Sequence, residues 1–186
     1  MKTKSIDSSN LTSISTIVMI GMCTAIIAVL SQLSIPLPSG VPITLQTFAI
    51  ALTGYLLGWK AGTISTLIYV LLGTLGVPVF SNFGAGPAVL FGKTGGFIFG
   101  FILMAFLCGL GMTAKGKVRP ILLILFSLLG LGACHLLGIV QFMFLTHMSF
   151  GASALLVSVP YLIKDVVSII FAYFISLTIR KAVFQS

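Results

Sequence analysis

The chain has 186 residues, of which 58% are hydrophobic and only 6% charged, and its formal net charge is +8. A soluble domain carries about 25% charged residues, and the polar residues here are too few to cover a water-exposed globule, so a soluble enzyme and a soluble nucleic-acid-binding protein are excluded. Because a spanning helix uses about 20 residues, this length predicts one membrane domain.

Apolar segments separated by Pro, Gly and basic turns predict six transmembrane helices. In chain order they cover about 13–33, 44–57, 61–75, 95–113, 121–145 and 154–179. A proline-rich segment, 34–42, ends the first helix, Gly58-Trp59-Lys60 separates the second from the third, and the Gly- and Pro-rich segment 76–92 caps the bundle. The expected fold is an all-α bundle over 13–181, with tails at 1–12 and 182–186.

The basic residues gather on one side of this predicted bundle. On the side of the termini lie Lys2, Lys4, Lys60, Lys115, Lys117, Arg119, Arg180 and Lys181. The connections on the other side, 34–43, 76–93 and 146–153, contain only Lys93. Because cytoplasmic loops are rich in Lys and Arg, we expect a multi-pass protein of a bacterial plasma membrane with both termini cytoplasmic. The positive charge thus indicates orientation in the lipid bilayer rather than a nucleic-acid partner.

Asp165 is the acidic residue that lies inside a predicted helix, about twelve residues from its start. A charge at the bilayer centre costs roughly 2.5–3.5 kcal/mol on insertion scales. Such a residue indicates ligand binding, a structural ion pair or proton coupling. Because adjacent residues of a helix point about 100° apart, we expect Lys164 to be a poor partner for Asp165.

Two outer connections hold further candidates for a binding site. Lys93 precedes the predicted helix at 95, where an ammonium and free amides suit a carboxylate; alternatively, Lys93 reaches the lipid headgroups. Asn82 can donate to and accept from an amide or urea-like group, or it is a turn residue with positive φ. Phe80 and Phe83 flank it and can pack on an apolar ring.

Gln46 begins the second predicted helix and is polar for its depth, so it starts the helix or lines a pocket. His135 and His147 have no acidic or cysteine companion at metal-ligand spacing, and the three cysteines are scattered. We therefore expect no catalytic residue and no metal site, and we interpret His135 as an interior group with satisfied hydrogen bonds.

Small residues lie along one side of the first predicted helix, at Gly21, Ala25 and Ala28. Small residues let another helix approach closely. They indicate either packing within this chain or docking to a partner protein.

Three segments together carry a family resemblance: Gly40–Phe48, Gly73–Phe80 and Gly92–Phe97. They resemble the BioY family, the biotin-binding membrane subunit of energy-coupling-factor (ECF) transporters, over about residues 13–183. The family's Pro-aromatic pair followed by Asp is matched by Pro160-Tyr161 and Asp165. Its later Lys is replaced here by Ser168, so a function for Lys164 does not carry over.

The resemblance implies a high-affinity biotin-binding subunit of an ECF-type ABC vitamin importer that captures biotin from outside. It would dock through Gly21, Ala25 and Ala28 to a transmembrane coupling protein and two ATPase subunits. Biotin would be the substrate, ATP would be used only by the partners, and the chain would need no cofactor and would not be an enzyme.

The same resemblance implies a role for each candidate residue in binding biotin. Asp165 would accept from the ureido N–H groups, Asn82 would complement the ureido edge, and Lys93 would bind the tail carboxylate. The aromatic residues and the polar pocket residue would complete the site: Phe80, Phe83, Tyr161 and Gln46. The alternative is a stand-alone proton-coupled secondary transporter of biotin or another small vitamin, with Asp165 as the proton relay.

Overall fold

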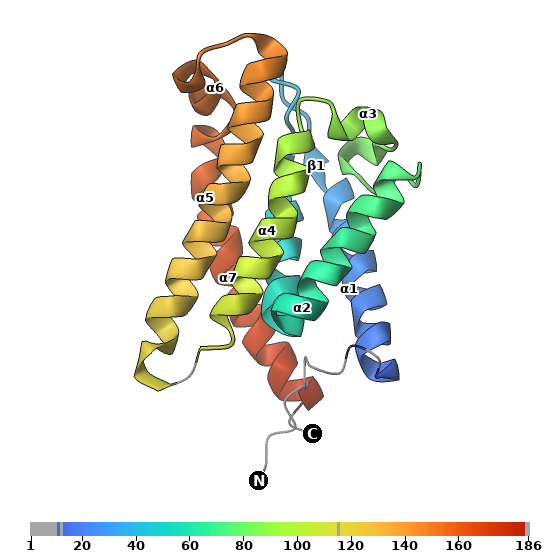
Figure 1. Ribbon diagram of the computed structural model, residues 1–186, viewed down its shortest axis with the longest axis vertical. Helices are drawn as coiled ribbons and strands as arrows, with labels where there is room; N and C mark the ends of the chain where they lie inside the picture. The colour runs from blue at the N-terminus through green and yellow to red at the C-terminus, as the bar shows by residue number, and fades with distance from the viewer. Residues whose placement is uncertain (1–10, 12, 115, 185–186) are drawn as a thin grey trace.

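The computed structural model describes residues 11, 13–114 and 116–184, most of which are helical (Figure 1). Most of the predicted tail 1–12 lies outside these residues. The elements are α1 (Ile14–Gln32), β1 (Ser34–Ile35), β2 (Ile43–Thr44), α2 (Gln46–Thr74), η1 (Ser81–Phe83), α3 (Pro87–Leu90), α4 (Gly95–Gly111), η2 (Gly116–Val118), α5 (Arg119–Thr146), α6 (Phe150–Val157) and α7 (Val159–Phe184).

Among the described residues, four stretches of helix are long and apolar enough to cross a membrane: Ile14–Gln32, Gln46–Thr74, Gly116–Thr146 and Val159–Ala182. The helix α4 is also apolar but shorter. This composition agrees with a multi-pass membrane protein.

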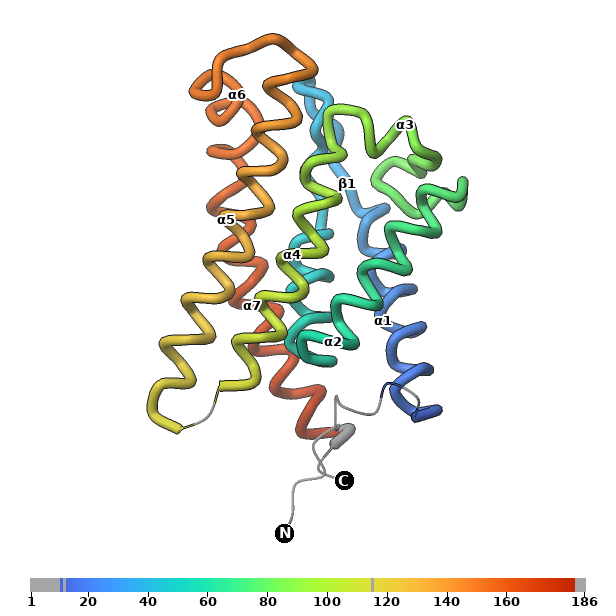
Figure 2. Tube along the Cα trace, in the orientation of Figure 1, coloured from blue at the N-terminus to red at the C-terminus, as the bar shows by residue number. Residues whose placement is uncertain are grey.

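The helix α2 is two arms joined by a bend at Gly58. This residue has φ 76° and ψ 179°, a region of backbone conformation that is essentially restricted to glycine. The arms 46–57 and 59–74 therefore run in different directions, as the tube in Figure 2 shows. They touch beside the bend, where a Cβ on Gly62 would lie 3.0 Å from the Cα of Gly54. The predicted break at 58–60 is confirmed, and a single residue, Gly58, has the non-helical conformation that produces it.

The connections predicted to share one side of the membrane lie together at one end of the bundle. The strands β1 and β2, α3 and α6 are at the upper end in Figure 1. The start of α1, the bend of α2, the start of α5 and the end of α7 are at the lower end. The basic residues Lys60, Lys117, Arg119, Arg180 and Lys181 thus belong to the lower end.

Two segments differ from the predicted pattern. The proline-rich connection is flanked by an antiparallel pair of short strands, in which Ser34 faces Thr44 and Ile35 faces Ile43. The predicted helix 154–179 is divided, since α6 ends at Val157 and α7 begins at Val159. Pro160 explains the division, because a proline inside a continuous helix lacks an N–H donor and clashes with the preceding turn. Asp165 therefore lies near the start of its helix rather than deep within it.

Close backbone contacts hold α4 in the middle of the bundle, between α2 and α5. A Cβ on Gly96 would lie 2.7 Å from the carbonyl carbon of Leu137, and one on Gly100 would lie 2.5 Å from the Cα of Cys134. At the lower end, a Cβ on Gly109 would lie 2.5 Å from the carbonyl carbon of Gly58. Such approaches are typical of helices that pack within a membrane through small residues.

We expect Gly109→Ala to destabilise the protein by about 1–3 kcal/mol, because the added methyl group collides with the backbone of the α2 bend. Gly132→Ala on α5 is the matched control. A Cβ there meets no heavy atom within 4 Å, so the gain in helix propensity should stabilise by about 0.5–1 kcal/mol. Thermal unfolding of both variants in detergent measures the difference, and equal unfolding temperatures would contradict the close contact.

Candidate functional site

Asp165 is the centre of a buried charged cluster near the upper end of the bundle. Its side chain is 5% exposed. One carboxylate oxygen, Oδ2, lies 3.2 Å from Nε2 of His135 on α5, and the other, Oδ1, forms an ion pair with Nζ of Lys164. A charge buried away from water requires such partners.

The ion pair between Lys164 and Asp165 corrects the expectation that neighbouring residues on a helix would not interact. The Lys164 ammonium also donates to the backbone carbonyl of Thr44 at 2.8 Å. The long, flexible lysine side chain therefore turns toward α2 and β2 and passes the carboxylate on the way. Sequence spacing describes where the Cβ atoms point, and the ammonium of a lysine reaches far from its Cβ.

His135 is interior and hydrogen-bonded, as expected, but its position beside Asp165 was not predicted. A carboxylate can only accept, so Nε2 of the ring carries the hydrogen that faces Asp165. The other ring nitrogen, Nδ1, lies 2.9 Å from the hydroxyl of Ser158, in the break between α6 and α7. The ring also meets Phe97 edge-on. One signal in the sequence could have suggested this contact: His135 lies inside the predicted helix 121–145, and Asp165 lies inside the predicted helix 154–179.

Gln46 is held at the start of α2 by two polar neighbours. Its Oε1 accepts from the Thr44 hydroxyl at 2.9 Å, and its Nε2 donates to the Tyr69 hydroxyl at 2.8 Å. Gln46 therefore has both of the positions considered from the sequence, because it begins α2 and also lines the cavity described next.

A cavity of about 50 Å³ lies between the charged cluster and the loop 34–43. Its walls come from distant parts of the chain: Val41, Pro42, Thr44, Gln46, Thr47, Ser81, Thr94, Phe97, Ile98, Phe101, Cys134, His135, Tyr161, Lys164 and Asp165. The cavity thus combines an acid, a base, amide and hydroxyl groups, and aromatic rings. Three of the predicted site residues, Asp165, Gln46 and Tyr161, meet here.

Tyr161 ties the loop 34–43 to the site. Its hydroxyl donates to the carbonyl of Val41 at 2.6 Å, while its side chain is buried against α5 and the loop. Because Val41 and Pro42 also line the cavity, this hydrogen bond holds the loop over it.

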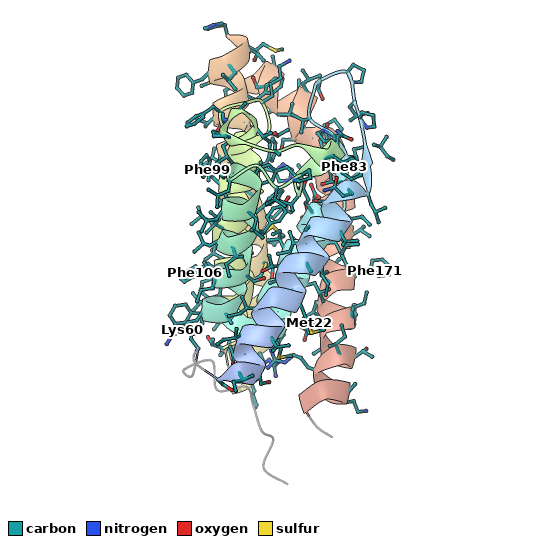
Figure 3. All side chains as sticks on the ribbon, turned by 90° about the vertical axis from the view of Figure 1, so that its right-hand side faces the viewer. Met22, Lys60, Phe83, Phe99, Phe106 and Phe171 are labelled. Carbon is teal, nitrogen blue, oxygen red and sulfur yellow. The ribbon has the colours of Figure 1, made fainter. Side chains whose placement is uncertain are left out.

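The aromatic residues predicted from segment 76–92 do not line this cavity. Phe80 is fully buried, stacks edge-on against Tyr69 with ring centroids 5.5 Å apart, and covers Gly73. Phe83 is 71% exposed and lies at the upper end of the bundle in Figure 3. Their neighbour Ser81 does reach the cavity. Contact of either ring with a ligand stays a prediction.

Asn82 has a φ of 55° and ψ of 37°, which is the turn conformation considered from the sequence. Its Oδ1 accepts from the Ser34 hydroxyl at 2.6 Å. The side chain therefore joins the segment 76–92 to the first strand, and its contact with a ligand stays a prediction.

Two glutamines fasten the segment 76–92 to the helices below it. Gln32 at the end of α1 donates to the carbonyl of Phe80 at 3.1 Å and accepts from the N–H of Phe83 at 2.9 Å. Gln141 of α5 donates to the carbonyls of Leu90 and Gly92, both at 2.7 Å. The segment is thus a structured cap rather than a loose loop.

Lys93 is exposed at the end of this cap. Its side chain lies over Gly40, where a Cβ would be 3.2 Å from the lysine Cδ. Lys93 therefore bridges the two outer connections, one residue from Thr94 at the cavity wall. Gly40 has a φ of 82°, so a glycine is needed both for the turn and for the close contact.

The predicted docking residues lie mostly on the outward side of α1. Gly21 and Ala25 are exposed, and Ala28 is half-buried against the core. Met22, next to Gly21, is 60% exposed and marks this helix in the foreground of Figure 3. Thr24 points inward instead, toward Ser65 of α2. The outward residues are thus accessible to a partner helix.

Comparison with known proteins agrees with the resemblance seen in the sequence. The profile of the BioY family matches residues 1–185. A biotin transporter BioY of Thermotoga maritima is 40% identical over 161 residues, which are 87% of this chain and 93% of that protein. Biotin transporter BioY2 of Lactococcus lactis is 33% identical over 172 residues, or 92% and 93% of the two chains.

A solved structure has the same fold. The crystal structure of the S-component for biotin from an ECF-type ABC transporter superposes with a TM-score of 0.78 and 29% sequence identity, covering 92% of this chain and 94% of that one. The S-component fold, the match along nearly the whole chain and the similarity to BioY proteins lead to one conclusion: the chain belongs to the BioY family.

Proposed function

We propose that the chain is the biotin-binding subunit of an ECF-type importer, which captures biotin from outside the cell. The observation that carries the proposal is the cavity beside Asp165, because it places buried polar groups and aromatic rings together in a chain related to biotin transporters. Ligand sites in proteins have this composition, with a mainly apolar wall and a few fixed polar groups.

The chemistry of the cavity suits biotin, which has a ureido group with two donors and one acceptor, an apolar sulfur ring and a carboxylate tail. The carboxylate of Asp165 accepts from the ureido N–H groups. The rings of Tyr161, Phe97 and Phe101 pack on the bicyclic ring. Lys93, at the outer rim, binds the tail carboxylate.

Binding requires the outer connections to move. A pocket for a small molecule has a volume of roughly 300–1,000 Å³, whereas the cavity beside Asp165 measures about 50 Å³. The loop 34–43 is the movable wall, since it is attached through the Tyr161 hydroxyl and the Lys93 contact rather than by a helix. Its closure over biotin would exclude water and strengthen the polar contacts.

The remaining parts of the proposal concern topology and partners. The helix arms 46–57 and 59–74 with α1, α4, α5 and α7 make six crossings, and the basic lower end faces the cytoplasm. The outward side of α1 docks to a transmembrane coupling protein, and two ATPase subunits supply the energy. The subunit reorients as a whole to release biotin, because a bundle without an inverted repeat has no half to rock against the other.

A second function has one observation in its favour. Ionisable groups buried in a membrane protein often form proton relays, and His135, Asp165 and Lys164 are in contact here. A stand-alone proton-coupled transporter would use this cluster as its relay. It would work without partners and would lose uptake when a protonophore is added.

We expect Asp165→Asn to weaken biotin binding by about 10- to 150-fold, because a hydrogen bond to a charged group contributes about 1.5–3 kcal/mol. Equilibrium binding of labelled biotin to the purified chain in detergent measures this loss. Asp7→Asn, which changes the acid in the predicted tail, should bind like the wild type. If Asp165→Asn also binds like the wild type, the site lies elsewhere.

Lys93→Ala should weaken the binding of biotin by about two- to fivefold, the effect of an exposed ion pair. The same variant should bind biotin amide, whose tail has no charge, as well as the wild type does. Lys60→Ala at the opposite end of the bundle is the charge-matched control. An equal loss for biotin and its amide would mean that Lys93 acts on the loops and not on the carboxylate.

Ala25→Leu should reduce biotin uptake by cells that contain the coupling module at least about tenfold, which corresponds to about 1.4 kcal/mol lost from the docking interface. Binding to the isolated chain should not change, because Ala25 is exposed on α1 and no residue of α1 lines the cavity. Met22→Leu is the control, because it replaces one large exposed side chain of α1 by another and adds no bulk at Ala25. Unchanged uptake in Ala25→Leu, combined with loss under a protonophore, would favour the stand-alone transporter.

A further inference from the structure

Three buried polar side chains lead from the break between α6 and α7 to the cavity. The hydroxyl of Ser158, in the break, lies 2.9 Å from Nδ1 of His135, and Nε2 of His135 lies 3.2 Å from Oδ2 of Asp165. His135 and Asp165 line the cavity, whereas Ser158 does not. An effect of Ser158 on a ligand in the cavity therefore has to pass through another residue, and its hydroxyl points to His135.

The sequence around Ser158 leaves its hydroxyl available to the ring. A serine that precedes a helix usually accepts from the N–H of the second or third helical residue. The second residue of α7 is Pro160, which has no N–H. The third is Tyr161, whose N–H donates to the carbonyl of Ser158 at 2.9 Å. The usual capping partners are thus missing or already occupied, and the hydroxyl is directed across to α5 instead.

The two contacts of His135 select one tautomer of its ring. A carboxylate can only accept, so Nε2 carries a hydrogen toward Asp165. Lys164 already balances the charge of Asp165, so a neutral ring leaves this buried cluster without net charge. In the neutral ring Nδ1 is then the acceptor, and the Ser158 hydroxyl donates to it. The other tautomer would turn a lone pair of Nε2 toward the carboxylate.

The ring and the hydroxyl are both held in place. Phe97 of α4 meets the ring of His135 edge-on, with ring centroids 5.9 Å apart. The N–H of Ser158 donates to the carbonyl of Ala154 at 3.0 Å, and its carbonyl also accepts from the N–H of Leu162 at 3.1 Å. Ser158 is therefore a fixed donor between two helices, beside the upper part of α5 (Figure 1).

We propose that Ser158 and His135 are positioning residues for biotin binding. The Ser158 hydroxyl keeps His135 in the tautomer with hydrogen on Nε2, and His135 holds the Asp165 carboxylate in the orientation that receives the ureido group. A carboxylate has about four acceptor positions, so the contacts with His135 and Lys164 leave room for the ureido N–H donors. This inference rests on the proposed binding of biotin at Asp165 and adds to it a residue outside the cavity.

The affinity is tested by equilibrium binding of labelled biotin to the full chain in detergent. Ser158→Ala should weaken binding about two- to tenfold, the range for the loss of one neutral hydrogen bond. Ser158→Thr keeps the hydroxyl and should bind like the wild type. Ser153→Ala on α6 is the matched control, because Ser153 is also fully buried but its hydroxyl has no hydrogen-bond partner among the described residues.

A double-mutant cycle tests whether Ser158 acts through Asp165. Once Asp165→Asn has removed the carboxylate, the tautomer of His135 has no charged acceptor to orient. Ser158→Ala should therefore add no further loss of biotin binding in the Asp165→Asn background. Losses that add in full would mean that Ser158 affects binding independently of the carboxylate, and the proposed role would be wrong.

The tautomer is measured directly on the ligand-free chain by ¹⁵N NMR of the histidine rings. His147→Gln removes the other histidine of the chain, so the remaining signals belong to His135. We expect a protonated Nε2 and an unprotonated Nδ1, and a mixture of the two tautomers when Ser158→Ala is added. A change in packing alone would not move a proton between the ring nitrogens.

Two kinds of result would overturn the inference while leaving the proposed function intact. The first is a Ser158→Ala variant that binds biotin like the wild type, or a Ser158→Thr variant that loses as much affinity as Ser158→Ala. The second is a ring of His135 that carries hydrogen on Nδ1 in the presence of Ser158. A folded, monodisperse wild type that does not bind biotin would instead contradict the proposed function, whatever the tautomer of His135.

Discussion

A carboxylate that is shielded from water needs positive or hydrogen-bonding partners, and Asp165 obtains them from two directions. His135 connects it to α5, and Lys164 connects the same turn of α7 to the backbone at Thr44. Because α5 and α7 pack mainly on other helices, this cluster adds a polar link between them at the upper end of the bundle, beside the apolar contacts of Tyr161. The same groups face the cavity, so the carboxylate proposed to meet a ligand is paired with His135 and Lys164 in this structure.

Much of the architecture is readable from single residues. The bend of α2 occurs at Gly58 because the conformation there is essentially limited to glycine, and the capping segment 76–92 follows from its Gly and Pro content. Asp165 and Gln46, which line the cavity, were identifiable as candidates because each is polar within an apolar segment. In these cases the residue type alone was sufficient, since the backbone freedom of a glycine and the polarity of a side chain do not depend on distant neighbours.

Other features depend on neighbours that are remote in the sequence. Lys164 meets Asp165 because Thr44 provides a second acceptor, and His135 meets it because α5 and α7 converge. The glycines of α4 are a further example: their spacing resembles the small-residue pattern of α1, but Gly96 and Gly100 pack within the chain while Gly21 is exposed. Both helices carry small residues four positions apart, and the tertiary contacts show which of these residues pack within the chain.

The bend at Gly58 also bears on how the chain enters the membrane. At 1.5 Å per residue the arms 46–57 and 59–74 are about 18 and 24 Å long, both shorter than a hydrocarbon core of about 30 Å. Neither arm alone has the length by which a nascent segment partitions into lipid as an independent helix. Each arm therefore depends on the other to complete a membrane-spanning unit, and we expect the pair to enter the lipid together as a hairpin bent at Gly58.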